Sequence, residues 1–328
     1  MLEVAIMKHI LIVNPAAGKT NALPRIREEA AALAEKYDIE IYETKGRGDA
    51  TAYVRSRIEK EPDTPMRFYS CGGDGTLKEV ANGAVGARCA SVSCYPSGSG
   101  NDFVKYYGGA ANFLSLEALF EGEEREIDLL FDGKEYSVNA ANFGFDYFVC
   151  ETMEKVRRFP LLGGKRAYYA GIVTALFTAM KNHVRVVADG ELLTEDDAFL
   201  LCTLANGNYI GGSYMCAPRS DNEDGLLELC YVKALSVPRF LKMIGYYKKG
   251  EHLDAAALKP YIIYKRVARV EVTSPDKDFG YALDGEMHEC GSFTLEIAPK
   301  ALRFAIPKAA AEFIANRKKE REDALLSK

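Results

Sequence analysis

The chain has 328 residues, of which 48% are hydrophobic and 27% charged, and its formal net charge is −5. This composition is typical of a globular protein of one or two domains, and the negative balance argues against a nucleic-acid-binding protein. No segment offers the ~20 apolar residues of a membrane-spanning helix, and eight cysteines without metal-ligand spacing indicate reduced thiols in a cytoplasmic protein.

Strands and helices alternate from residue 9 to about residue 128. Apolar runs predict strands, and amphipathic stretches between them predict helices. Such alternation favours a doubly wound α/β domain, in which helices cover both faces of a parallel sheet. In chain order we expect strands at residues 9–13, 39–42, 66–69 and 92–95, and helices at 22–37, 49–61 and from 77.

The first strand is followed by a turn that ends in Gly18, Lys19 and Thr20. These residues match the end of a Walker A loop, but that motif also needs a glycine at position 13, where the chain has Val13. The missing first glycine therefore argues against a true P-loop. Asn14 and Gly18 still offer donors to a phosphate, whereas the alternative is a plain strand-to-helix turn.

The third strand is followed by Gly72, Gly73, Asp74, Gly75 and Thr76, directly before a helix. Glycines allow the backbone to approach an anion closely, and the amides at a helix start point toward it. This turn therefore predicts a phosphate site, with a simple tight turn as the alternative. The negative Asp74 suits a metal or water rather than phosphate itself.

The fourth strand is followed by a polar loop at residues 96–102, which contains Ser99, Asn101 and Asp102. Taken alone, this loop is better interpreted as a cap at the start of a helix. Turns after parallel strands meet at the carboxyl edge of the sheet, where α/β proteins bind ligands. We therefore expect the three turns to form one site.

Beyond residue 128 short strands dominate, which predicts a second, mostly antiparallel domain of the β-sandwich type. We place the nucleotide-binding domain at residues 1–128, rejoined by 302–328, and the β-rich substrate domain at 129–301. The expected strands are 136–142, 184–188, 198–204, 226–233, 267–273 and 293–297, with helices at 167–182, 238–248 and 309–328.

Two acidic motifs lie in this second half. Asp284 and Glu286 flank Gly285, and such a pair can supply a general base and a metal ligand, although Asp-Gly is also a common hairpin turn. The loop at residues 220–225 offers oxygens to a hard cation, and a solvated turn is the alternative.

Together these motifs closely resemble the bacterial lipid kinases of the soluble diacylglycerol kinase family. The resemblance runs in order along nearly the whole chain. It rests on the runs at residues 14–19, 72–83 and 96–103, on Asp128, Asn139 and 144–146, and on 206–207, 217–218, 224–225 and 284–286. Ser99, where the family usually has threonine, and the run Gly211-Gly212-Ser213 depart from the pattern.

The resemblance implies an enzyme that transfers a phosphoryl group from ATP to a lipid hydroxyl, with Asp284 as general base. It implies a magnesium network of Asp74, Asp102, Asp128 and Glu286, near Lys19 and Asn101, and a second magnesium site at Asp221, Asp224 and Leu226. The implied nucleotide contacts are Asn14, Pro15, Ala16, Ala17, Gly18, Thr44, Gly72, Gly73, Asp74, Gly75, Thr76, Leu77, Lys78, Glu79, Gly98 and Ser99.

The sequence leaves the acceptor open among diacylglycerol, phosphatidylglycerol, ceramide and other lipid alcohols. An NAD kinase and a catalytically silent nucleotide-binding module are the alternatives. We expect a lipid substrate at a membrane surface, no nucleic-acid partner, peripheral association with the inner face of the membrane, and a homodimer. Four cations and three apolar residues at 157–166 suggest a membrane-docking loop, with a loop packed into the second domain as the alternative.

Overall fold

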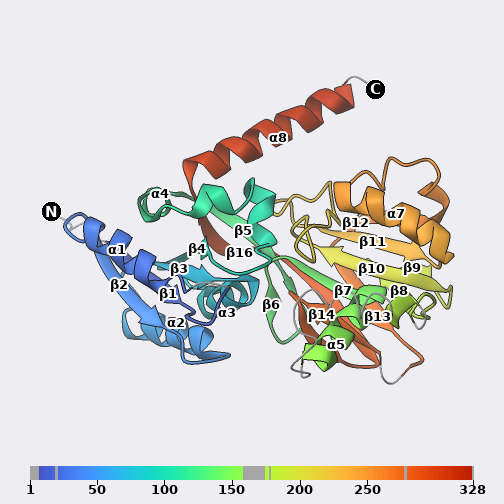
Figure 1. Ribbon diagram of the computed structural model, residues 1–328, viewed down its shortest axis with the longest axis horizontal. Helices are drawn as coiled ribbons and strands as arrows, with labels where there is room; N and C mark the ends of the chain where they lie inside the picture. Colours follow the sequence, from blue (N-terminus) through green and yellow to red (C-terminus); the bar gives the residue numbers. More distant parts are fainter. Residues whose placement is uncertain (1–6, 19–20, 158–173, 177–178, 277–278, 327–328) are drawn as a thin grey trace. The chain divides into compact units, whose positions relative to one another are not determined.

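The computed structural model describes residues 7–18, 21–157, 174–176, 179–276 and 279–326 (Figure 1). The chain divides into two compact units. Unit 1 comprises Met1–Asp128 and Lys300–Lys328, and unit 2 comprises Leu129–Pro299. Two strands, β5 (Glu123–Phe131) and β16 (Ser292–Ile306), run from one unit into the other.

Unit 1 has a parallel sheet in the order β2-β1-β3-β4-β16. Helices follow each of the first three strands, so the predicted doubly wound α/β domain is confirmed (Figure 1). The strands are β1 (Lys8–Val13), β2 (Asp38–Glu43), β3 (Met66–Gly72) and β4 (Ala90–Pro96). The helices are α1 (Leu23–Leu33), α2 (Asp49–Lys60), α3 (Asp74–Ala84), α4 (Leu116–Phe120) and α8 (Lys308–Leu326), with 3-10 turns η1 (Phe103–Tyr107) and η2 (Ala110–Phe113).

The spacing of apolar residues explains how the helices of unit 1 pack. In α1 the buried residues Leu23, Ile26 and Ala30 recur at helical intervals, so they form one face against the core. Helices α2 and α3 approach closely because Gly83 has no side chain. A Cβ there would lie 2.6 Å from the Cβ of Val54.

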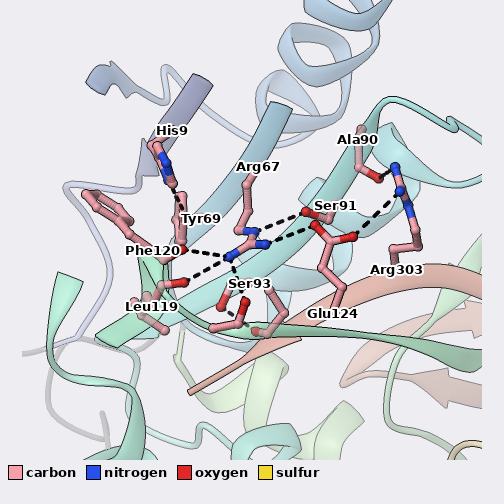
Figure 2. A network of polar contacts seen from close by, with 12 residues as sticks. His9, Arg67, Tyr69, Ala90, Ser91, Ser93, Leu119, Phe120, Glu124 and Arg303 are labelled. Carbon is pink, nitrogen blue, oxygen red and sulfur yellow. Dashed lines mark hydrogen bonds and ion pairs between the residues drawn. The ribbon is translucent and has the colours of Figure 1, made fainter. Parts of the chain in front are cut away.

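A buried arginine organises the amino-terminal ends of these strands (Figure 2). Arg67 of β3 donates to the carbonyls of Leu119 and Phe120, and thereby satisfies acceptors that the end of α4 leaves open. It also donates to Glu124 at 3.0 Å and to the hydroxyl of Ser91 at 3.2 Å. This network lies at the opposite strand ends from the glycine turn.

Unit 2 is built from two antiparallel sheets, which confirms the predicted β-sandwich. One sheet has the order β12-β11-β10-β7-β14-β15, and the other joins the first part of β16 to β13, β8 and β9. The strands are β6 (Tyr136–Ser137), β7 (Ala140–Gly144), β8 (Arg185–Ala188), β9 (Glu191–Thr194), β10 (Phe199–Ala205), β11 (Leu227–Lys233), β12 (Ile262–Val267), β13 (Arg269–Thr273), β14 (Gly280–Leu283) and β15 (Glu286–Glu289).

Among the described residues, unit 2 also contains helices α5 (Phe145–Arg157) and α7 (Val237–Lys249) and the 3-10 turn η3 (Lys259–Tyr261). The rings of Phe145 of α5 and Phe240 of α7 pack at a tilt of 50°, with centroids 4.8 Å apart. Both belong to an apolar cluster over the outer face of β10 and β11. Within the described ranges, no helix is both long and apolar enough to cross a membrane.

The structure corrects three local expectations. The strand expected at 136–142 is two strands, because the amides of residues 138–140 bind a side chain instead of a neighbouring strand. The strand expected at 267–273 is divided between β12 and β13, which belong to different sheets. Helix α5 was not expected. The loop at 158–166 and most of the helix expected at 167–182 lie outside the described residues.

Candidate active site

The glycine turn of unit 1 joins β3 directly to α3. Gly73 is the residue before the first turn of α3, and no side chain caps this helix start. Asn14, at the end of β1, donates from its side chain to the hydroxyl of Thr76 at 3.1 Å. Its own side-chain oxygen accepts from the amide of Ala16 at 3.0 Å. The turn after β1 and the glycine turn after β3 are therefore linked by a side-chain hydrogen bond.

The third turn packs backbone to backbone against the second. The amides of Ser97 and Gly98 both donate to the carbonyl of Gly72, at 2.8 and 3.2 Å. A Cβ on Gly98 would lie 2.4 Å from the Cα of Gly73. Only glycine fits at position 98, so these glycines create a close backbone approach of the kind that phosphate sites use.

Two of the predicted acidic residues meet beside Gly100. A Cβ on Gly100 would lie 3.1 Å from Oδ2 of Asp74 and 3.8 Å from Oδ2 of Asp102. Oδ1 of Asp74 accepts from the amide of Phe103 at 3.3 Å, and Asp102 forms an ion pair with Lys105. Asn101 adopts a positive φ of 48° and donates to the carbonyl of Gly98 at 2.9 Å. The pair of carboxylates is an oxygen donor set suited to a hard cation.

Glu79 has structural contacts that its sequence position did not indicate. Helix α2 has Gly48 at its amino-terminal cap and no cap from its own side chains. Glu79 of α3 instead accepts from the amides of Gly48 at 2.8 Å and Ala50 at 3.2 Å. This carboxylate therefore caps a neighbouring helix and complements the positive end of its dipole.

The other predicted nucleotide residues differ in exposure. Thr76, Leu77 and Lys78 are buried, whereas Pro15, Ala16, Gly18, Gly75 and Ser99 are exposed and Ala17 is half-buried. The amide of Thr44 donates to the carbonyl of Val13 at 2.9 Å, which keeps the end of β2 beside that of β1. Lys19 lies outside the described residues.

Asp128 is fully buried in β5, and its Oδ1 accepts from the amide of Lys300 at 2.8 Å. A cavity of about 380 Å³ lies elsewhere in unit 1, at the amino-terminal strand ends, where Met66, Glu124 and Arg303 contribute to its lining. The three turns of the predicted site lie at the carboxyl edge of the sheet, so the site is distinct from this cavity.

In unit 2, Asp284 occupies the turn between β14 and β15. Asp284 and Gly285 have positive φ values of 50° and 83°, as a two-residue type I′ hairpin requires. The prediction of a hairpin turn at Asp284 and Gly285 is thus correct, and the turn also orients the Asp284 side chain. Glu286 is the first residue of β15 and is half-buried.

Four donors from one segment hold the Asp284 carboxylate. Oδ1 accepts from the hydroxyl of Ser137 at 2.7 Å and from the amides of Asn139 and Ala140 at 3.2 and 3.0 Å. Oδ2 accepts from the amide of Val138 at 3.0 Å. Donors aimed at both oxygens favour the ionised form and fix its orientation. An oriented, ionised carboxylate can act as a base.

Among the described residues, one group combines histidine, aspartate and glutamate ligand atoms all within 4.8 Å of one another: Asp132, Glu135 and His288. Nε2 of His288 lies 3.1 Å from Oε1 of Glu135, and Tyr281 donates to Asp132 at 2.6 Å. Burial acts in the opposite direction, but the hydrogen bonds to Asp132 hold its pKa below the ordinary value. None of the members of this group is a predicted magnesium ligand.

The acidic loop at residues 220–225 is held by its own backbone. Oδ1 of Asp221 accepts from the amide of Glu223 at 3.3 Å, and Oδ1 of Asp224 accepts from that of Leu226 at 3.0 Å. The guanidinium of Arg266 pairs with the other oxygen of Asp224. Burial nevertheless raises the pKa of Asp224. The three predicted magnesium ligands, Asp221, Asp224 and Leu226, thus belong to one short segment. The Arg266 guanidinium already pairs with Asp224.

Sequence reasoning missed Lys105 and the segment 137–140. The spacing of Asp102 and Lys105, three apart, was the available signal for the first. No local signal marked the second, because its partner Asp284 lies more than 140 residues away.

Comparison with known proteins agrees with the kinase family that the sequence motifs resemble. Residues 8–131 match the model of the diacylglycerol kinase catalytic domain, and residues 139–306 match that of the YegS C-terminal NAD kinase beta sandwich-like domain. The chain is 27% identical over 284 residues to a diacylglycerol kinase of Bacillus subtilis, covering 84% of this chain and 88% of the relative.

A second relative, from Chromohalobacter salexigens, carries the name "Probable lipid kinase YegS-like". It is 29% identical over 310 residues, which is 92% of this chain and 94% of the relative. A crystal structure of a diacylglycerol kinase from Bacillus anthracis has the same fold, with a TM-score of 0.67 and 21% identity over 92% of this chain and 98% of that one. The chain therefore belongs to the diacylglycerol kinase catalytic-domain family of kinases, and its β-sandwich is the YegS-type C-terminal domain of that family.

Proposed function

We propose that the protein transfers the γ-phosphoryl group of ATP to the hydroxyl of a lipid alcohol, with diacylglycerol as the first candidate. The family relationship supports a kinase. The observation that carries the proposal is the half-buried Asp284 carboxylate, which four donors hold in one orientation at the hairpin turn between β14 and β15. Phosphoryl transfer requires positioning and charge neutralisation more than covalent chemistry, and a fixed base suits it.

The glycine turn of unit 1 fits the phosphates of ATP. Gly73 and Gly98 lie so close that a Cβ at position 98 has no room, and the uncapped amides at the start of α3 point outward from the turn. Phosphate oxygens accept hydrogen bonds from such amides and are attracted by the helix dipole. The side chains of Asn14 and Thr76 fix the neighbouring turn through their own hydrogen bond.

The carboxylates of Asp74 and Asp102, both beside Gly100, fit a magnesium ion. Bound there, magnesium supplies positive charge against the phosphates during transfer. Lys105 keeps Asp102 oriented through their ion pair. Asp128, Glu286, Lys19 and Asn101 remain proposed members of this network, and Asp221, Asp224 and Leu226 remain a proposed second magnesium site.

Asp284 is proposed as the general base. The lipid hydroxyl oxygen attacks the γ-phosphorus, its proton passes to an oxygen of Asp284, and ADP leaves with the electrons of the broken P–O bond. Each of the two carboxylate oxygens already accepts from the segment 137–140, so the carboxylate cannot rotate away from the substrate. A positioned base contributes roughly 100- to 10,000-fold to such a rate.

The test is a panel of acceptors with labelled ATP and product identification. Purified protein is given magnesium, ATP and mixed micelles of diacylglycerol, ceramide or phosphatidylglycerol, with NAD as a soluble acceptor. We expect phosphatidic acid as the main labelled product. Label in NAD, or ATP binding without transfer to any acceptor, would favour the two alternatives raised by the sequence.

A further inference from the structure

A histidine and two carboxylates from two different hairpins meet in unit 2. Asp132 and Glu135 lie at the two ends of the turn between β5 and β6, and His288 lies on β15. Each offers one ligand atom, and these atoms all lie within 4.8 Å of one another. All three side chains are half-buried. None of them has a role in the proposed phosphoryl transfer, so the group calls for a separate explanation.

The ring nitrogen of His288 that lies in this group makes no hydrogen bond within the described part of the chain. Nε2 is shielded from solvent, and its contact of 3.1 Å with Oε1 of Glu135 lacks hydrogen-bond geometry. His183 offers a comparison, because its Nδ1 lies at the same 3.1 Å from Oδ1 of Asp196 and is placed for a hydrogen bond. Buried polar atoms normally have a partner, and a bound ion is one that can fill this role.

The carboxylate of Asp132 is held in a fixed orientation beside this nitrogen. Its Oδ1 accepts from the amides of Lys134 and Glu135 at 2.8 and 2.9 Å, and its Oδ2 accepts from the hydroxyl of Tyr281 at 2.6 Å. The ring of Tyr281 also stacks on that of His288, with centroids 4.9 Å apart. A carboxylate oxygen has two lone pairs, so Oδ2 can bind an ion as well. Such outer contacts orient the ligands of metal sites.

Charge and distance both suit a divalent transition metal. Asp132 and Glu135 bring two negative charges close together, an arrangement that a cation between them relieves. Zinc binds nitrogen and oxygen ligands tetrahedrally at about 2.0 to 2.1 Å, which separates neighbouring ligand atoms by about 3.4 Å. The 3.1 Å between His288 and Glu135 is close to this value. The imidazole favours zinc over magnesium, which prefers oxygen ligands alone.

We propose that Asp132, Glu135 and His288 bind a divalent transition-metal ion of the zinc type, with water as the fourth ligand. The ion would join the turn between β5 and β6 to β15. Ser137 of β6 donates to Asp284, and Asp284 forms the turn that leads into β15. The two hairpins that the ion joins are therefore the two that meet at Asp284. This proposal goes beyond the proposed function, because binding of the ion requires neither ATP nor a lipid.

The test is zinc binding by the full chain, measured by isothermal titration calorimetry and by thermal melting. The protein is first freed of metal with a chelator. It is then kept in a constant excess of magnesium, which occupies the proposed magnesium sites. The ligand variants are His288→Phe, which retains a ring to stack on Tyr281, and Glu135→Gln, which retains the shape of the side chain. Tyr281→Phe removes only the hydroxyl that orients Asp132.

Two control variants address other routes for zinc. His183→Gln removes the histidine of the His183–Asp196 pair, which has one carboxylate instead of two. Cys290→Ser removes a half-buried thiol two residues after His288, which is the nearest alternative zinc ligand along the chain. Circular dichroism verifies that each variant is folded.

We expect the parent to bind one zinc ion per chain and to melt at a higher temperature with zinc, because a ligand that binds only the folded state stabilises it. Tyr281→Phe should weaken zinc binding by roughly 10- to 100-fold, as changes outside the ligand shell do. Loss of a ligand in His288→Phe or Glu135→Gln should cost more, at least about 100-fold. Both control variants should bind zinc as the parent does.

Absence of zinc binding by the parent in excess magnesium would overturn the proposal. Binding that survives in both ligand variants, or that is lost in Cys290→Ser or His183→Gln while the ligand variants retain it, would also overturn it and assign the zinc to another place. Binding is measured without turnover, so a failure of the lipid-kinase proposal appears separately, as absent phosphorylation.

Discussion

The hydroxyl of Ser137 donates a hydrogen bond of 2.7 Å to Oδ1 of Asp284, although 147 residues separate them in the chain. Ser137 ends the short strand β6 and is fully buried, and the next three residues give their backbone amides to the same carboxylate. The proposed base is therefore positioned by a distant segment rather than by its own hairpin alone.

We predict that Ser137→Ala lowers kcat by about threefold to tenfold and leaves the Kd for ATP unchanged. Three amide donors remain, so the carboxylate is still held but less rigidly, and the loss of kcat is well below the roughly 100- to 10,000-fold that a positioned base contributes. Steady-state kinetics and nucleotide titration measure both values. As a control, the exposed Ser236 is changed to alanine. An unchanged kcat in Ser137→Ala would show that this contact does not position the base.

Glu79→Ala should lower the free energy of unfolding by about 1 kcal/mol. It removes the two acceptors that Glu79 supplies to the start of α2, and loss of a helix cap typically costs this amount. Urea denaturation measures the change, with Glu79→Gln, which keeps one acceptor, as the intermediate case. Equal stability of all three proteins would show that α2 does not depend on Glu79.

We predict that magnesium stabilises the folded protein through Asp224. If Asp221, Asp224 and Leu226 bind a structural magnesium ion, the melting temperature of the nucleotide-free parent rises with added magnesium and that of Asp224→Ala does not. Without magnesium the variant should already be destabilised by roughly 1 kcal/mol, since the amide of Leu226 loses its acceptor and Arg266 loses its contact with Asp224 while keeping that with Glu228. A magnesium response in Asp224→Ala equal to that of the exposed-site control Asp196→Ala would exclude the site.

Stability should fall in acid partly because of His9. Burial, with a smaller effect of the nearby Arg67, lowers the pKa of His9 from 6.5 to about 4. Below pH 6.5, His9 therefore binds a proton in the unfolded chain but stays neutral in the folded protein until the pH approaches 4. The stability from this group is complete above pH 6.5 and is lost as the pH falls toward 4, by roughly 3 kcal/mol at most.

His9→Gln should accordingly show a smaller loss of stability between pH 6.5 and 4 than the parent. Urea denaturation at several pH values checks this, with the exposed His183→Gln as a control. Nδ1 of His9 lies 2.6 Å from the hydroxyl of Tyr69 (Figure 2). The side chain is buried near the cation of Arg67, and this environment favours the neutral imidazole. Parallel pH curves for parent and variant would contradict the linkage.

The sequence predicted the architecture well where one local pattern dominated. Buried strands such as β1 and β3, each followed by a glycine or asparagine turn and a helix, have few other interpretations. The joining of the three turns in unit 1 also followed from a general rule, since parallel strands present their carboxyl ends at one edge. Helix α5 was missed because it begins directly at the end of β7, where Gly144 alone, with a φ of 83°, makes the turn.

Contacts between distant segments could not be predicted in the same way. Nothing near Asp284 indicates that residues 137–140 will leave the strand pattern to bind it, and nothing near Glu79 indicates that it will cap α2. Both contacts depend on register between elements, which tertiary packing decides. The roles proposed for Asp128, Glu286 and Lys19 came from the family resemblance and stay predictions.

The most direct test of the central claim is transfer of label from ATP to diacylglycerol by the parent protein and by Asp284→Asn. The amide has nearly the same shape but is not basic, and its Nδ2 would face the amide of Val138 in place of an acceptor. We predict labelled phosphatidic acid from the parent, at least ~100-fold less from the variant, and similar ATP binding by both. Turnover by Asp284→Asn within a few-fold of the parent, with the variant folded, would contradict the assignment of Asp284 as the base.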